Sequence, residues 1–309
     1  MRVLVMGGGA VGGYYGGALA AAGHDVTLVA RGPHLAAIQE RGIELREESG
    51  DRVVRLRAIA EPTQAEANQN LVLFTVKTYD TCAAISALAP AVGDSTSILT
   101  LQNGVDSADV LREAFGAERV LAGTTNIFVT VLDPGIVLRR GELRTVTLGE
   151  HSGEATPRLA QIAGALRDAG VDVVVVPDIR AAVWEKFVLL AATASLTTVC
   201  VASTGEVLRE PEGEPLFRGL LREVEAVGRA SGVTLRSDIE EHIVAFARSW
   251  AFDARSSMQV DFERCRRVEL EQVTGTVVRR GHELGVAIPT FELLYAILRI
   301  RARAFGGID

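Results

Sequence analysis

The sequence predicts a protein of the α/β class, in which a doubly wound parallel sheet is followed by an all-helical C-terminal domain. The first observation is that short apolar runs alternate with helical segments in the N-terminal half, a pattern typical of parallel strands joined by crossover helices. The second is a change of character after Pro177, beyond which helical periodicity prevails. We therefore expect two domains, residues 1–177 and 178–309.

Apolar runs rich in Val, Ile and Leu predict the strands. Residues 71–76 are almost entirely apolar, as expected of a strand covered by helices on both faces. Residues 123–149 instead alternate Thr, Val and Leu around a turn at Asp133-Pro134-Gly135, which predicts an antiparallel extension. The predicted strands are 2–6, 25–30, 71–76, 98–101 and 171–176, and the predicted helices are 10–22, 79–88, 107–115, 156–169, 183–201, 215–230, 238–250 and 264–284.

Composition excludes several classes of protein. The chain is 48% hydrophobic and 23% charged, which is ordinary for a globular protein and unlike a disordered one. The net charge of -7 argues against a nucleic-acid partner. The three cysteines form no CxxC pair, so we expect neither a disulfide framework nor a Cys-rich metal site, and we expect a reducing, cytoplasmic location.

Two further features bear on location. The N-terminus lacks the apolar length and cleavage site of a signal peptide. The longest apolar stretch, residues 187–202, is diluted by Thr and Ser and falls short of the roughly 20 residues that a bilayer requires. We interpret it as a buried helix and expect no membrane partner.

The strongest local motif is G-x-G-x-x-G, formed by Gly7, Gly9 and Gly12 between the first strand and the first helix. In a dinucleotide-binding turn these glycines allow the tight turn, the approach of a pyrophosphate and close helix–strand packing. Ala10 and Val11 open the helix, whose free N–H groups favour an anion. The motif and its context predict a Rossmann domain, although a glycine-rich turn without a ligand is the simpler alternative.

The end of the second strand selects the cofactor. Sites for NAD place Asp or Glu there, whereas an Arg accommodates the 2′-phosphate of NADP. This strand ends in Val29-Ala30-Arg31-Gly32, so we predict NADP or NADPH, with Arg31 on the 2′-phosphate. The alternative is a solvated loop arginine.

Three polar residues stand where a reaction could use them. Lys77 and Asn103 follow apolar strands, at the sheet edge where ligands of open α/β sheets bind. Lys186 lies in an apolar helical segment, where burial would lower its pKa and make it a usable proton donor. The simpler alternatives are surface or turn residues for Lys77 and Asn103, and for Lys186 a side chain that extends to solvent.

The order of these motifs resembles the ketopantoate reductase (2-dehydropantoate 2-reductase) family over essentially the whole chain. Each piece is weakly specific alone, and together they are highly specific. The matching pieces are residues 7–12, Thr75-Val76-Lys77, Gln102-Asn103-Gly104, residues 122–125, Trp184-Glu185-Lys186, and residues 256–258 through Glu269 to residues 277–280.

The resemblance implies a Rossmann domain, a helical domain and NADPH-dependent reduction of ketopantoate to pantoate in pantothenate biosynthesis. It implies that Lys186 donates a proton to the carbonyl oxygen and that Glu269 is the acid beside it. It further implies that Asn103 and Lys77 lie where cofactor and substrate meet, and that Ser257 binds substrate.

One departure from the family concerns the substrate. The archetype carries Asn four and eight residues after the catalytic lysine, where this chain has Leu190 and Ala194. Losing hydrogen-bonding partners should weaken discrimination for a substrate hydroxyl. Alternatives to ketopantoate are therefore a more apolar 2-oxo acid or ketone, a 2- or 3-hydroxy acid dehydrogenase reaction, and a catalytically inactive NADP-binding sensor.

Oligomeric state is left open by the sequence. The helical C-terminal part has apolar faces that could pair in a homodimer, although core packing is the simpler interpretation. Examples of these apolar residues are Phe291, Leu293, Leu294, Ile297 and Leu298.

Overall fold

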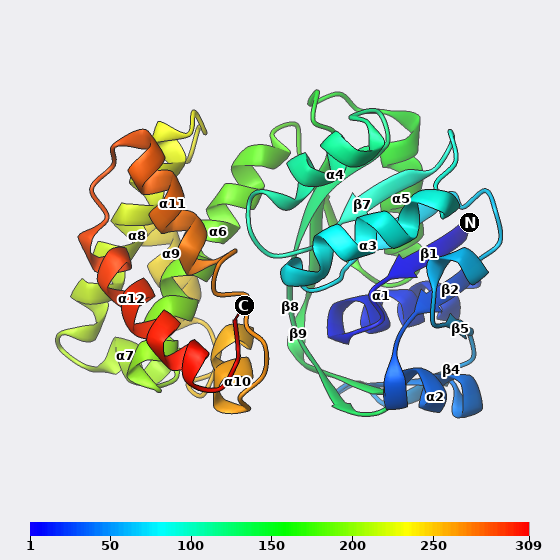
Figure 1. Cartoon of the computed structure of the whole chain (residues 1–309), viewed down its shortest axis with the longest axis horizontal. Coiled ribbons are helices and arrows are strands. Elements are labelled where there is room, and N and C mark those ends of the chain that lie inside the picture. Colours follow the sequence, from blue (N-terminus) through cyan, green and yellow to red (C-terminus); the bar gives the residue numbers. More distant parts are fainter. Residues whose placement is uncertain (309) are drawn as a thin grey trace. The chain divides into compact units, whose positions relative to one another are not determined.

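The computed structural model describes residues 1–308 and confirms the predicted fold class, a mixed α/β sheet unit followed by an all-helical unit (Figure 1). The contacts divide the chain into two compact units. The sheet unit comprises Met1–Gln102 and Asp106–Ala182, and the helical unit comprises Asn103–Val105 and the chain from Val183 onward. The short segment that contains Asn103 is thus grouped with the helices.

The sheet has the strand order β4-β3-β9-β8-β7-β6-β1-β2-β5, with β10 also paired to β9. Its centre is parallel and apolar, and all four residues of β6 are fully buried. Such strands need cover on both faces, which the crossover helices supply. The parallel strands predicted from sequence are β1 (Arg2–Met6), β2 (Asp25–Val29), β6 (Leu71–Phe74), β7 (Ser97–Thr100) and β10 (Asp172–Val175).

The antiparallel extension is also confirmed. Strands β8 (Val120–Asp133) and β9 (Ile136–Gly149) pair across the turn at Pro134-Gly135, where Gly135 has φ +79°. Short strands that the sequence analysis missed complete the sheet. They are only three or four residues long, too short for a strand pattern to stand out even where, as in β3, apolar and polar residues alternate: β3 (Ile43–Arg46), β4 (Arg52–Val54) and β5 (Arg57–Ile59).

The helices of the sheet unit match the prediction closely except for α2, which was missed. Helix α2 begins with Gly32-Pro33, residues that read as a turn, but Pro is well tolerated in a first helical turn. Thr156 caps α5 by accepting the N–H of Leu159. The helices are α1 (Ala10–Ala21), α2 (Gly32–Arg41), α3 (Thr81–Leu88), α4 (Ser107–Phe115) and α5 (Pro157–Asp168), with short 3₁₀ turns at Pro62–Gln64, Thr78–Asp80 and Ala89–Ala91.

In the helical unit, the predicted helix 264–284 is wrong in its first half. Residues 264–273 are not helical, and Cys265 has φ +50°. The Val268 N–H donates to Gly307 O at 2.9 Å, a tertiary hydrogen bond that a continuous helix would not allow. The helices are α6 (Ile179–Cys200), α7 (Thr204–Arg209), α8 (Gly213–Ala230), α9 (Ile239–Arg248), α10 (Ser257–Glu263), α11 (Thr274–Leu284) and α12 (Pro289–Ala304).

Helix α6 is longer than the apolar stretch 187–202 from which a membrane span was judged too short. It begins at Ile179 and has 22 residues, so by length and composition alone it could span a membrane. The length argument against a span was therefore wrong. However, 67% of its most apolar window is buried inside the protein, as in the core helix of a globular domain.

Helix α12 carries the apolar side chains that could pair in a homodimer. Phe291, Leu294 and Leu298 are buried, so core packing accounts for them. Leu293 is 61% exposed and Ile297 is half-buried. A homodimer stays a prediction.

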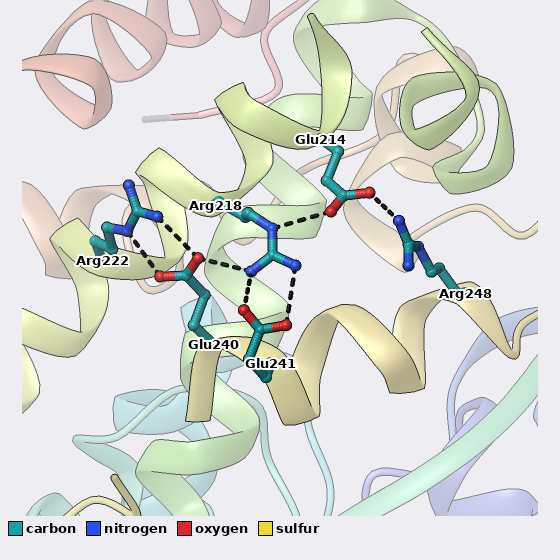
Figure 2. A network of polar contacts seen from close by, with 6 residues as sticks. All are labelled: Glu214, Arg218, Arg222, Glu240, Glu241 and Arg248. Atoms are coloured by element: carbon teal, nitrogen blue, oxygen red, sulfur yellow. Dashed lines mark hydrogen bonds and ion pairs between the residues drawn. The ribbon is translucent and has the colours of Figure 1, made fainter. Parts of the chain in front are cut away.

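An arginine–glutamate network joins α8 to α9 (Figure 2). Arg218 donates to Glu214 at 3.0 Å, to Glu240 at 2.8 Å and to both carboxylate oxygens of Glu241 at 2.7 and 3.0 Å. Arg222 binds both oxygens of Glu240, and Arg248 pairs with Glu214. Because Arg218 is only 19% exposed and serves three carboxylates, it is the centre of the network.

We expect Arg218→Met to lower the free energy of unfolding by about 2 kcal/mol, because it leaves partly buried carboxylates without their donor. The exposed pair of Arg236 with Asp238 supplies the control, and Arg236→Met should cost less than about 0.5 kcal/mol. Urea unfolding followed by circular dichroism measures both. Equal losses would show that the network adds nothing to an ordinary surface pair.

Candidate functional site

Packing requires two of the three motif glycines. Gly7 has φ +108°, and a Cβ built on it would lie 2.6 Å from the backbone N of Val76. A Cβ on Gly12 would lie 2.2 Å from Gly7 O and 2.3 Å from Thr75 Oγ1. Neither position accepts a side chain, so the turn between β1 and α1 must be as tight as the dinucleotide motif requires.

Gly9 is different, because a Cβ built on it would meet no atom within 4 Å. Packing therefore does not explain this glycine, whereas close approach of a ligand to the backbone would. Gly9 is also the N-cap of α1 and provides no side-chain cap, so the first-turn N–H groups at Ala10 and Val11 lack a side-chain acceptor from that position. This arrangement fits a pyrophosphate at the helix N-terminus.

Arg31 lies two residues after the end of β2, as the N-cap of α2, and its side chain is exposed. No carboxylate stands at this strand end, because the intervening residue is Ala30. The position therefore offers a cation, and the residues present fit NADP better than NAD.

The helical unit brings together three of the predicted residues. Lys186, half-buried on α6, donates from Nζ to Asn103 Oδ1 at 3.2 Å. Glu269, buried in the non-helical segment 264–273, acts on the same ammonium through its charge. Burial lowers the pKa of Lys186 to about 8, and the nearby Glu269 carboxylate opposes that shift.

The remaining predicted residues lie as follows. Leu190, half-buried, and Ala194, fully buried, follow Lys186 at four-residue spacing on α6. Ser257 is exposed at the first residue of α10, next to its N-cap Ser256. Lys77 is half-buried after β6, where it caps the 3₁₀ turn Thr78–Asp80.

Residues that the sequence analysis did not select hold the loops in place. Thr75 Oγ1 donates to Gly7 O at 2.9 Å. Gln102 Nε2 donates to Val76 O and to Thr81 Oγ1, both at 2.9 Å. Thr75 and Gln102 stand inside the family-like motifs, which is the signal that could have identified them. His34 also contacts the glycine-rich loop, and nothing in its sequence context indicated this.

Among residues 1–308, no group of three or more His, Cys, Asp or Glu side chains could hold a metal ion. The candidate chemical groups are a lysine, an amide, a carboxylate and a loop for a dinucleotide.

The sequence matches two consecutive family models, "Ketopantoate reductase PanE/ApbA" over residues 3–153 and its C-terminal counterpart over residues 178–302. The chain belongs to the ketopantoate reductase PanE/ApbA family. It is thus a member of an oxidoreductase family that uses NAD(P)H, as the glycine-rich loop and the position of Lys186 predict.

Relatives of this ketopantoate reductase family member match over full length. The 2-dehydropantoate 2-reductase of Halobacterium salinarum is 32% identical, over 98% of this chain and 99% of the relative. The crystal structure of a PanE/ApbA family ketopantoate reductase from Ralstonia eutropha JMP134 is 35% identical, with TM-score 0.91 over 99% of this chain and 100% of that chain. D-mandelate dehydrogenase, solved with NADH and anilino(oxo)acetate, is 19% identical over 99% and 100% of the two chains, with TM-score 0.90, and shows the shared fold.

We expect Glu269→Gln to lower the pKa of Lys186 below its value of about 8, because the carboxylate that favours the ammonium is removed while burial remains. The chain has only two lysines, Lys77 and Lys186, so protein labelled with ¹³C-lysine gives two sets of side-chain NMR signals to titrate. Lys77→Arg protein assigns them. An unchanged or raised pKa of Lys186 would contradict the proposed role of Glu269.

Proposed function

We propose that this protein reduces the 2-oxo group of a small acid with NADPH, with ketopantoate as the first candidate substrate and Lys186 as the general acid. The observation that carries the proposal is the half-buried Lys186 ammonium, with its pKa lowered to about 8, its bond to Asn103 and the opposing charge of Glu269. An ammonium with this pKa is about nine-tenths protonated at pH 7 and can still release its proton.

The glycine-rich loop and Arg31 would hold the cofactor. The N–H groups at Gly9, Ala10 and Val11 would bind the pyrophosphate, while Gly7 and Gly12 keep the turn tight. Arg31 would bind the 2′-phosphate by charge-assisted hydrogen bonds. When bound, the nicotinamide supplies the hydride, and the protein supplies orientation and charge.

Lys186 has two tasks in such a reduction. Its positive charge stabilises the negative charge that develops on the carbonyl oxygen, and its proton then neutralises that oxygen, which leaves a neutral amine to be reprotonated from water. Asn103 orients Nζ through their hydrogen bond, and Glu269 favours the protonated form. We assign Ser257 to substrate binding and Lys77 to the contact between cofactor and substrate, as in the family.

The rarity of lysine relative to arginine in this chain supports the role of Lys186 as the general acid. Of the 32 Lys and Arg residues, only Lys77 and Lys186 are lysines. Arginine cannot release its proton at neutral pH, whereas a buried lysine can. A chain that otherwise uses arginine has lysine at the position where proton donation needs it.

The relatives and the apolar residues after Lys186 on α6 favour different candidate substrates. The relatives named 2-dehydropantoate 2-reductase favour ketopantoate, which carries a hydroxyl beyond its two methyl groups. Leu190 and the buried Ala194, both apolar, favour a more apolar 2-oxo acid or ketone. The lowered pKa of Lys186 argues against an inactive NADP-binding sensor, which would not need a proton donor.

Ketopantoate and 3,3-dimethyl-2-oxobutanoate, which lacks only the hydroxyl, are the matched pair that separates the two candidates. A site that binds the hydroxyl should prefer ketopantoate in kcat/KM by about 100-fold or more, and an apolar site should not. NADPH oxidation measures both rates. Absence of turnover on both compounds and on a wider set of 2-oxo acids and ketones, with NADPH still bound, would favour the sensor instead.

Replacing Lys186 tests the mechanism. We expect Lys186→Met to lower kcat by about 10²- to 10⁴-fold. Lys186→Arg keeps the charge but not the proton transfer and should remain strongly impaired. In the unaltered protein, kcat/KM should fall above about pH 8, because the required ammonium then deprotonates. A kcat near that of the unaltered protein in Lys186→Met would remove the residue from this role.

Replacing Arg31 tests the cofactor. We expect Arg31→Ala to raise the KM for NADPH about 10- to 100-fold, because charge-assisted hydrogen bonds to the 2′-phosphate are lost. The KM for NADH, which lacks that phosphate, should change little. Arg140→Ala, at an exposed position on β9 of the same unit, is the control. An unchanged KM for NADPH in Arg31→Ala would refute the assignment to the 2′-phosphate.

A further inference from the structure

His34, in the first turn of α2, contacts two backbone groups that lie far apart in the sequence. Its Nε2 lies 2.9 Å from Gly8 O, in the glycine-rich loop. Its Nδ1 lies 2.9 Å from the amide N of Gly135, in the β8–β9 turn. One half-buried imidazole therefore joins the loop, helix α2 and the hairpin turn within the sheet unit.

Only one form of the imidazole satisfies both contacts. A backbone amide can only donate, so Nδ1 must be unprotonated to accept the Gly135 N–H. A neutral imidazole then carries its proton on Nε2, which donates to Gly8 O. Protonated His34 would carry N–H groups at both nitrogens, and the one at Nδ1 would oppose the Gly135 N–H. The two contacts therefore require neutral His34.

The bond to Gly8 O sets the direction of a donor on the next residue. In a trans peptide the C=O of one residue and the N–H of the following residue lie in one plane and point in opposite directions. The chain has no cis peptide among residues 1–308. Holding Gly8 O toward α2 therefore directs the Gly9 N–H to the opposite side. The Gly8 N–H, which donates to Val29 O at 2.7 Å, fixes the other side of that residue.

We propose that His34 is a positioning residue for the dinucleotide, whose neutral form fixes the Gly8–Gly9 peptide so that the Gly9 N–H binds the pyrophosphate. The inference rests on the proposed binding of the cofactor at this loop. It adds a pH dependence: protonation of His34 puts a proton on Nδ1 against the Gly135 N–H, so the ring must move, the Gly8–Gly9 peptide is held less firmly, and cofactor affinity falls. Since His34 acts through the loop peptide and takes no part in the proposed proton transfer, the rate at saturating cofactor should not follow its protonation.

The surroundings of His34 favour the neutral form. Burial lowers the pKa of the imidazole, and this effect exceeds that of the hydrogen bond to Gly8 O, which raises the pKa. The charged groups on the elements around it are Arg31, before α2, Glu40 and Arg41, within α2, Arg57 on β5, which packs against α2, and Asp133 at the end of β8. The weakening should therefore begin at a lower pH than the ordinary titration of a histidine.

The test is to measure the affinity of the full-length protein for NADP⁺ by calorimetry between about pH 8 and about pH 5. NADP⁺ is used because it withstands acid better than NADPH. Because the 2′-phosphate also titrates near pH 6, NAD⁺ is measured in parallel. We expect both affinities to fall as the pH is lowered, while kcat at saturating cofactor does not follow the same curve. Affinity for NAD⁺ that is independent of pH would overturn the proposal.

Two substitutions of His34 each keep one of its two hydrogen bonds and remove the other. The amide N of Gln lies near the place of Nε2, so His34→Gln can still donate to Gly8 O but does not titrate. The amide O of Asn lies near the place of Nδ1, so His34→Asn can accept the Gly135 N–H but does not reach Gly8. His151→Gln, at an exposed position of the same unit, is the control.

We expect His34→Gln to bind NAD⁺ within about threefold of the unaltered protein at pH 8, with the fall at low pH removed, and His34→Asn to bind about tenfold more weakly. A fall at low pH retained in His34→Gln, or equal affinities in the Gln and Asn variants, would overturn the proposal. Failure of the unaltered protein to bind either nucleotide at pH 8 would instead refute the proposed function.

Discussion

The balance between burial and a neighbouring charge at Lys186 is the constraint on which the proposed chemistry of this protein depends. Burial alone would favour the neutral amine, which cannot donate to a carbonyl oxygen in need of a proton. Full exposure would leave an ordinary ammonium that holds its proton too firmly at neutral pH. The Glu269 charge sets the pKa between these limits, at about 8. The contacts that place Glu269 are therefore part of the proposed catalytic arrangement.

The segment that places Glu269, residues 264–273, is not helical. A helix from 264 to 284 would satisfy its own backbone, but it would carry Glu269 on a regular helical face. Instead, the Val268 N–H bonds with Gly307 O, and helical i to i−4 bonding resumes only near the start of α11, where the Val273 N–H donates to the Glu269 carbonyl at 3.0 Å. At Val268 a tertiary hydrogen bond has replaced a helical one, and local helix propensity does not oppose the exchange strongly.

This difference shows what the sequence could predict. The central strands, the glycine-rich loop and the β8–β9 turn were predicted correctly because each depends on neighbours in sequence: continuous apolar residues, glycines at fixed spacing, and a Pro-Gly turn. Strands β3 to β5, the segment around Glu269 and the contact of His34 with Gly135 depend on partners up to 101 residues away. No local pattern encodes such partners. The resemblance to a family supplied Glu269, which periodicity alone placed within the predicted helix 264–284.

The two parts of the proposed machinery are held by different forces, and their responses to pH differ accordingly. Neutral hydrogen bonds from Thr75 and His34 fix the carbonyls of the cofactor loop, so only acid, which protonates an imidazole, disturbs it. Charge and burial hold Lys186 in its reactive state, so alkali, which removes the proton, disturbs it. The acid response therefore belongs to cofactor affinity and the alkaline response to the chemical step. A single pH profile of activity would merge them, whereas cofactor binding and turnover measured separately assign each response to its own residue.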